Sequence, residues 1–183
     1  SVRRLKTLGE WARSKHIEAR WLDPAEVAEL ETALAPTWGG LLAPAHGYVR
    51  AAQLTDALED AARGHGVVVH TGVRVERLSH TVDGVSAIAA DASYHAQHAV
   101  IAAGSWSGEI APETNVTPVR GQLLYVAWRG SAIGRILWSD HCYIVPWLDG
   151  TLLIGATVER AGFDERVTGG GVQGLLNAAI AVL

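Results

Sequence analysis

The sequence predicts an α+β fold, in which helices accompany largely antiparallel sheets and the chain forms two lobes. Three observations support this class. An Asp-Gly pair separates apolar, β-branched runs at residues 83–84 and again at 149–150, which is a strong hairpin signal. Residues 50–63 carry apolar side chains at helical spacing. The apolar run 98–103 ends in a glycine, as expected of a strand buried on both faces of a parallel sheet.

The amino-terminal region is expected to be mainly helical. Residues 2–16 have apolar positions at helical spacing, and residues 23–34 open with Asp-Pro-Ala-Glu. In this order Asp caps the helix, Pro occupies its first position and Glu completes a capping box. The Gly- and Pro-rich residues 38–48 are expected to form a strand and a loop.

The rest of the chain divides by its pattern into a middle α/β block and a carboxyl-terminal antiparallel block. The middle block should contain the helix 50–63, a hairpin centred on 82–85, and strands at 67–70, 73–78 and 98–103. The second block should contain strands at about 119–128, 136–138, 142–148 and 152–157, followed by an apolar helix at 172–183. We therefore predict one lobe from residues 1–48 and 115–183, and a second from 49–114.

Composition excludes several classes of protein. The 183 residues suffice for one sizeable domain or two small lobes. A net charge of −4 gives no electrostatic signature of a nucleic-acid partner or an anionic membrane surface. No apolar run approaches the ~20 residues that would span a membrane. The single cysteine rules out an internal disulfide and suits a reducing compartment, so we predict a cytoplasmic protein; homo-oligomers remain possible.

Three apparent motifs carry no chemistry by this interpretation. Residues 169–174 fit G-x-G-x-x-G, but no strand precedes them, so they are expected to mark a helix start rather than bind a dinucleotide. His95 and His98 would face opposite sides of a strand, so no metal site is predicted. Cys142 has no base on its own face of the predicted strand and is expected to be a buried, inert thiol.

The hairpin 141–157 resembles a known family. Its sequence is similar to the substrate-domain hairpin of the FAD-dependent amino-acid oxidases, the family of glycine, sarcosine and D-amino-acid oxidases. The similar segments are His-Cys-Tyr-Ile-Val-Pro before the turn and Leu-Leu-Ile-Gly-Ala-Thr after it. The resemblance implies that the Tyr143 hydroxyl binds the substrate carboxylate and that His141 lines the same pocket. From the residues alone, both are interpreted as half-buried strand residues, because aromatic side chains favour strands for packing. Trp147 departs from the family, whose close members tend to have Arg there.

Other segments of the chain resemble the cofactor-binding parts of this family. Residues 98–107 are similar to a strand end packed against the flavin, which implies that Ala103, Gly104 and Trp106 contact FAD. Residues 71–75 resemble a segment that reaches the adenine, a role that would fall to Val73. Arg120, in a Pro-Val-Arg-Gly-Gln segment, either approaches the ring system or is a solvated arginine.

The resemblance extends through nearly the whole chain and corresponds to the middle of such an oxidase. The lobe 49–114 would be part of a Rossmann-like FAD-binding domain, and the other lobe would bind a small amino-acid substrate. The family's amino-terminal G-x-G-x-x-G and its carboxyl-terminal substrate-clamping arginine are missing. The sequence also lacks methionine and ends within a predicted helix, so we interpret it as a piece of a longer protein.

The function implied is oxidative deamination by hydride transfer to flavin, with peroxide formed on reoxidation. No catalytic base is nominated, because the cofactor performs the difficult step. The isolated piece is expected to be inactive, and Tyr143 and Gly104 are expected to face one cleft. The alternative is a non-catalytic small-molecule-binding or interaction module.

Overall fold

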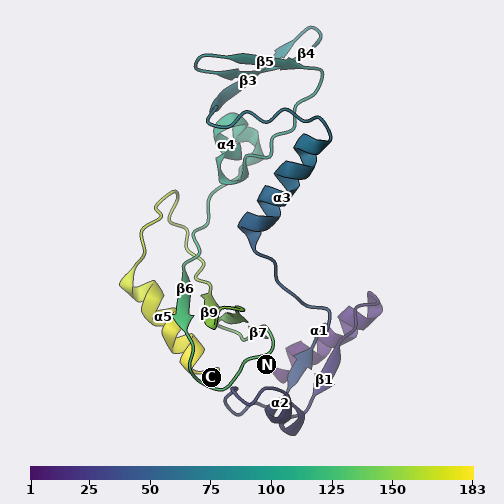
Figure 1. Cartoon of the computed structure of the whole chain (residues 1–183), viewed down its shortest axis with the longest axis vertical. Coiled ribbons are helices and arrows are strands. Elements are labelled where there is room, and N and C mark those ends of the chain that lie inside the picture. The colour runs from purple at the N-terminus through teal and green to yellow at the C-terminus, as the bar shows by residue number, and fades with distance from the viewer. The chain divides into compact units, whose positions relative to one another are not determined.

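The computed structural model describes all 183 residues, which divide into two compact units (Figure 1). Unit 1 contains residues 1–48, 121–158 and 166–183, and unit 2 contains residues 49–120 and 159–165. Residues 115–120 and 159–165 thus belong with the middle of the chain, although their sequence pattern placed them with the flanks. The cause is an antiparallel bridge between Arg120 and Glu159, whose backbone N–H groups each donate to the other's carbonyl at 2.9 Å.

Unit 1 is built on a four-stranded antiparallel sheet in the order β6-β9-β8-β7. Its strands are β6 (Leu123–Ala127), β7 (Leu137–Trp138), β8 (Tyr143–Pro146) and β9 (Thr151–Gly155). The helix α5 (Gly169–Ile180) packs against one face of this sheet, and Figure 1 shows it beside β6. The shared core contains Leu137, Cys142, Ile144, Leu152, Ile154, Leu175 and Ala179. Ile144 is completely buried, so the alternating pattern of β8 directs its even-numbered residues toward the helix.

The hairpin between β8 and β9 forms where the Asp-Gly pair predicts it, but with a longer turn. Trp147 donates its N–H to Thr151 O at 2.9 Å, which leaves residues 148–150 as a three-residue loop. Gly150 has a φ of +83°, as the last residue of such a loop commonly does. The Asp149 carboxylate accepts hydrogen bonds from Thr151 N at 3.0 Å and Thr151 Oγ1 at 2.6 Å, which explains why Asp suits this position.

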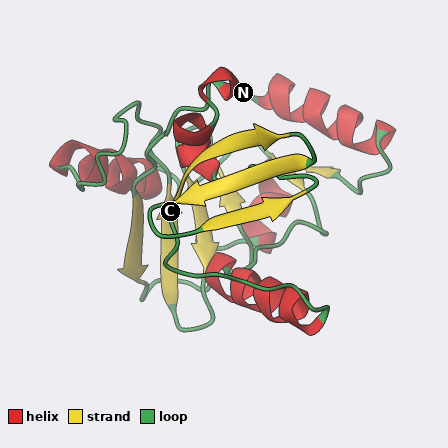
Figure 2. Ribbon diagram, turned by 90° about the horizontal axis from the view of Figure 1, so that it is seen from above, coloured by secondary structure: helices red, strands yellow, loops and turns green.

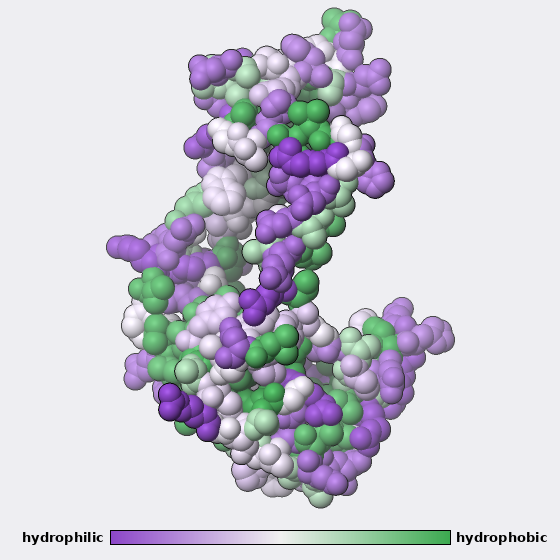
Figure 3. Space-filling model, viewed as in Figure 1, coloured by the Kyte–Doolittle hydropathy of each residue, from purple (hydrophilic) through white to green (hydrophobic).

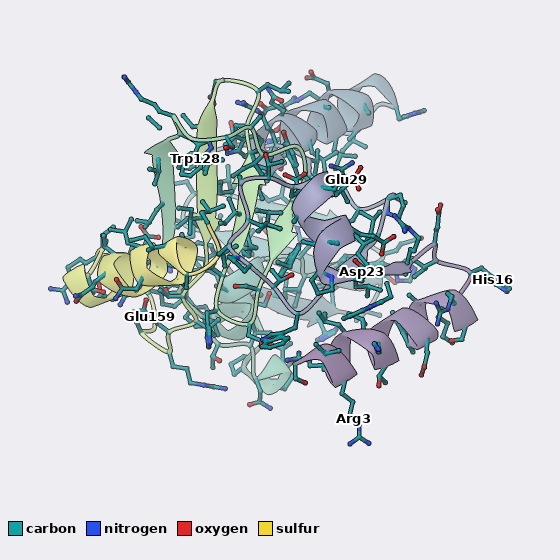
Figure 4. All side chains as sticks on the ribbon, turned by 90° about the horizontal axis from the view of Figure 1, so that it is seen from below. Arg3, His16, Asp23, Glu29, Trp128 and Glu159 are labelled. Atoms are coloured by element: carbon teal, nitrogen blue, oxygen red, sulfur yellow. The ribbon has the colours of Figure 1, made fainter.

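The amino-terminal part of unit 1 contains α1 (Val2–Ser14), β1 (Arg20–Leu22), α2 (Pro24–Leu30) and β2 (Gly40–Leu42). The predicted capping box is confirmed. Asp23 Oδ1 accepts from Glu26 N at 2.9 Å, and Asp23 N donates to Glu26 Oε2 at 2.8 Å. Figure 4 shows Asp23 at one end of α2 and Glu29 toward the other. The two short strands pair antiparallel across this helix connection.

Unit 2 contains one long helix and a three-stranded antiparallel sheet in the order β3-β4-β5, and Figure 2 shows these three strands side by side. The elements are α3 (Ala51–Gly64), β3 (Val75–Thr81), β4 (Gly84–Ala89), β5 (Ser93–Ala96), and three short helices, η1 (Gly104–Trp106), α4 (Ser107–Ile110) and η2 (Pro112–Thr114). The predicted hairpin at 82–85 is therefore confirmed, whereas β5 was not predicted. The α+β class, with helices and antiparallel sheets, is confirmed for the chain.

Two predicted strands of unit 2 do not form. Residues 67–70 and 98–103 have no strand assignment and pair with no neighbour. Their apolar side chains are largely exposed, with Val68 at 75% and Val100 at 91%. An apolar run becomes a strand only when another strand satisfies its backbone, and these runs have no such partner in the chain. Exposed apolar side chains also occur on α3. Figure 3 shows apolar and polar side chains together on its surface, and Leu58 is 61% exposed.

The last helix also differs from its predicted range. It begins at Gly169 rather than 172 and ends at Ile180 rather than continuing to the last residue. Thr168 caps it, with Oγ1 accepting from Gly171 N at 3.2 Å. None of the helices has both the length and the apolar character needed to cross a membrane.

Candidate functional site

The sheet of unit 1 has a second face, opposite α5, and Tyr143 lies on it. The strand registers align Leu123, Gly155, Tyr143 and Trp138 as one row across all four strands. Because successive residues of a strand point to opposite faces, the core residue Ile144 and its neighbour Tyr143 face away from each other. The predicted substrate residue thus lies on the side of the sheet that the packed helix leaves open.

Tyr143 combines a fixed ring with a free hydroxyl. The side chain is half-buried, and the Trp138 ring lies 5.0 Å away between centroids at an angle of 41°. The hydroxyl makes no hydrogen bond to any other residue of the chain. A half-buried phenol with an unused donor is equipped to bind a ligand acceptor.

The remainder of this face is apolar and aromatic. The next row consists of Tyr125, Leu153 and Val145. Beyond it, Trp147 contacts two tyrosine rings: Tyr48 edge-on at 4.7 Å and Tyr125 nearly parallel at 6.5 Å. Trp147, where close members of the resembled family have Arg, therefore joins an aromatic group here.

His141 is placed differently from its prediction. The strand β8 begins at Tyr143, so His141 lies in the four-residue loop that joins β7 to β8. Ser139 organises this loop, its Oγ accepting from His141 N at 3.2 Å and from Cys142 N at 3.0 Å. The imidazole is exposed, and strand alternation does not fix it on the face of Tyr143. Cys142 is buried in the core, as predicted.

Unit 2 brings two of the predicted cofactor segments together. A hollow of about 250 Å³ is lined by Trp106 and Ile110 on one side and by Val75 on the other. Arg74 and Glu109 also line it and form an ion pair at 2.8 Å between Nη2 and Oε2. Val73, next to Arg74 in sequence, is 38% exposed and lies in the coil before β3.

The strand end that the resemblance assigns to flavin contact is a tight turn. Ala103 O accepts from Trp106 N at 3.0 Å, which closes the first turn of η1. Gly104 has a φ of +52°, and a Cβ added to it would meet no atom within 4 Å. The backbone at Ala103 and Gly104 is therefore open to close approach by a ligand.

Trp106 has a partner that the sequence did not reveal. Its ring stacks on Phe163 at 5.5 Å between centroids and an angle of 26°, within unit 2. Phe163 is the one phenylalanine of the chain, in a polar stretch with no strand or helix pattern. Phe163 lies beside Trp106 because residues 159–165 are part of unit 2.

Arg120 is not a solvated arginine, which was one of the two alternatives left open by its sequence. Its side chain is 13% exposed, Nη2 lies 2.5 Å from Glu159 Oε2, and Nη1 donates to Asp164 O at 2.9 Å. The solvated alternative is wrong, because both of the paired acidic residues come from the returning segment. The ion pairs of Arg120 thus connect residues 159–165 to the middle of the chain.

The glycine-rich match at 169–174 is a helix start, as expected. Gln122 lies over its first turn: Nε2 donates to Thr168 Oγ1 at 2.9 Å and Oε1 accepts from Thr168 N at 2.8 Å. A Cβ on Gly171 would collide with the Gln122 amide, at 2.6 Å from Cδ and 2.8 Å from Oε1. The glycine at this position allows close packing of a buried amide. No group of three or more His, Cys, Asp or Glu side chains is arranged to hold a metal.

Comparison with known families supports the resemblance along the entire chain. The family model described as FAD dependent oxidoreductase matches residues 1–183. A glycine oxidase from Bacillus licheniformis is 33% identical over 172 residues, covering 89% of this chain and 46% of that protein. The bifunctional protein ThiO/ThiG of Synechocystis sp. is 33% identical over 167 residues, which is 87% of this chain and 25% of that protein.

Solved structures show the same fold. The crystal structure of glycine oxidase from Geobacillus kaustophilus matches with a TM-score of 0.85 and 29% identity, covering 95% of this chain and 49% of that one. An iminodiacetate oxidase from Chelativorans sp. matches with a TM-score of 0.75 at 23% identity. The chain spans just under half the length of these two glycine oxidases, from Bacillus licheniformis and Geobacillus kaustophilus.

Proposed function

This chain belongs to the FAD-dependent oxidoreductase family, and from that premise we propose that the whole protein oxidatively deaminates a small amino acid such as glycine, sarcosine or a D-amino acid. The observation that carries the proposal is the similarity to a glycine oxidase over 89% of the chain, together with the family match over residues 1–183. The chain by itself is proposed to be inactive. The cytoplasmic location stays a prediction.

Unit 2 suits the binding of part of FAD. The open backbone at Ala103 and Gly104 permits close contact with a flat ring system, and the half-exposed indole of Trp106 offers an apolar surface beside it. Val73 is proposed to contact the adenine from the coil before β3. When bound, FAD supplies the acceptor for the hydride that leaves the Cα of the amino acid.

Tyr143 is proposed to bind the substrate. Its hydroxyl, which has no partner within the chain, would donate a hydrogen bond to an oxygen of the substrate carboxylate. Hydrogen bonds to a charged acceptor are shorter and stronger than neutral ones, so this contact orients the amino acid. His141 is proposed to line the same pocket from the β7–β8 loop.

The other side chains of the open face favour a substrate with a small, uncharged side chain. Leu123, Leu153 and Val145 make this face apolar, and its strands carry no charged side chain. A second carboxylate on the substrate would have to be desolvated against this surface without a cation to receive it. Glycine, sarcosine and D-alanine meet this condition, and dicarboxylates do not.

The test uses the full-length flavoprotein. We expect glycine, sarcosine or D-alanine to bleach the flavin spectrum without oxygen and to yield hydrogen peroxide with it. Tyr143→Phe should raise KM about ten-fold or more and change kcat less, because one charge-assisted hydrogen bond is lost. Tyr94→Phe, which removes a hydroxyl from β5 in unit 2, is the matched control. Failure of all three amines to reduce the flavin would reject the proposal, as would equal KM values for the two variants.

A further inference from the structure

Gly155 lies directly beneath the Tyr143 side chain. The two residues are cross-strand partners of β8 and β9, and Leu123 of β6 is the partner of Gly155 on its other side. A Cβ built on Gly155 would lie 2.5 Å from the Tyr143 hydroxyl oxygen and 2.5 Å from Leu123 Cδ2, and it would also collide with Tyr143 Cζ. The phenol ring therefore crosses β9 through the space that a side chain at position 155 would occupy.

We propose that Gly155 is a positioning residue for the substrate-binding phenol, an inference that rests on the proposed function. With no side chain at position 155, the ring of Tyr143 lies across β9 and its hydroxyl is held above that strand. Trp138, at 5.0 Å on the β7 side, limits the opposite movement of the ring. Together the two residues restrict the hydroxyl to one region of the open face.

The reason for such positioning follows from the hydroxyl itself. A tyrosine hydroxyl can be oriented by a hydrogen bond to another group, but that of Tyr143 has none in the chain. Packing by Gly155 and Trp138 can hold the ring without using the donor, which stays available to a ligand. A donor that is already in place costs less entropy when the ligand binds.

A purely structural role for Gly155 predicts something different. Close packing of a tyrosine over a glycine also stabilises a sheet, and in that case a substitution would affect folding but not substrate affinity. The two roles separate in a double-mutant cycle, because a positioning effect needs the Tyr143 hydroxyl and a folding effect does not.

The experiment compares KM and kcat of the full-length flavoprotein for its amine substrate. We expect Gly155→Ala to raise KM about ten-fold, similar to Tyr143→Phe, while kcat falls less. The double variant should have the KM of Tyr143→Phe alone, since displacing a ring without a hydroxyl removes nothing further. Gly174→Ala is the control, because a Cβ at this site in α5 would meet no atom within 4 Å.

Trp138→Ala provides a second route if Gly155→Ala does not fold. Trp138 is 64% exposed, so its removal is compatible with folding, and we expect a several-fold rise in KM that disappears in the Tyr143→Phe background. The inference would be overturned if the effects on KM of Gly155→Ala or Trp138→Ala multiplied with that of Tyr143→Phe in the double variant. An unchanged KM in Gly155→Ala would also overturn it. Neither result would affect the proposed function. An unchanged KM in Tyr143→Phe would reject the substrate role of Tyr143 and the inference with it.

Discussion

Substituting Gly171 by alanine should destabilise unit 1, although alanine normally stabilises a helix. Gly171 lies in the first turn of α5, where a Cβ would enter the space of the Gln122 amide. Gln122 is only 6% exposed and makes two hydrogen bonds to Thr168, the residue that caps the helix. The added methyl group must displace this amide or shift the helix.

The magnitude follows from these contacts. Two hydrogen bonds contribute about 1 kcal/mol each, and the loss is larger if the buried amide is left unpaired. The gain in helix propensity from Gly to Ala is at most about 1 kcal/mol and applies to helix interiors, so it is smaller in the first turn. We therefore expect Gly171→Ala to lower the free energy of unfolding by about 1–3 kcal/mol. Each kcal/mol should lower Tm by about 2–4 °C in a chain of this size.

The assay is thermal unfolding together with hydrogen exchange of the α5 amides. Gly170→Ala is the matched control, one residue earlier in the same turn, where a Cβ meets no atom within 4 Å. In a Gln122→Ala background the penalty of Gly171→Ala should vanish, because the colliding amide is gone. Equal stability of the two alanine variants would refute the reasoning, and so would a penalty that persists without Gln122.

Two further substitutions test contacts that define each unit. Asp23→Ala should lower the free energy of unfolding by about 1 kcal/mol by removing the α2 capping box, as measured by urea titration. Asp60→Ala, on exposed α3 surface, should change it by less than ~0.5 kcal/mol, and equal effects would contradict the capping role. Arg120→Ala should cost about 1–3 kcal/mol and speed proteolysis within residues 159–165. Arg63→Ala removes an exposed ion pair worth ~0.5 kcal/mol or less. An equal loss of unfolding free energy in the two arginine variants would contradict a stabilising role for the Arg120 ion pairs.

Local signals predicted local structure well. The Asp23 capping box and the hairpin at 149–150 depend on residues within a few positions of each other, so their patterns can be read directly from the sequence. The apolar runs 67–70 and 98–103 failed as strands because pairing depends on a neighbour that the run itself does not specify. The apolar composition of these runs is typical of a buried strand, but it contains no information on which strand would pair with it.

The candidate site was predictable in part. Resemblance identified Tyr143, and alternation gave the face of β8 on which it lies, opposite Ile144. Phe163 beside Trp106 and the ion pairs of Arg120 escaped prediction, because they arise from residues about 40 to 60 positions apart in the sequence. The signal that could have located Gly155 was the register of the hairpin, since a three-residue loop at 148–150 pairs position 143 with 155.

Glycines 155 and 171 show why a residue type can mislead when only its local role is considered. Neither has the positive φ that makes glycine favourable in turns, and each lies in or at the start of a regular element. Their requirement comes from a partner side chain, Tyr143 in one case and Gln122 in the other, which occupies the space of the missing Cβ. Both partners are polar and reach across from a neighbouring segment of unit 1. A glycine inside a strand or helix, without turn geometry, is therefore best examined for the side chain that crosses it, and at Gly155 that side chain is the one proposed to bind substrate.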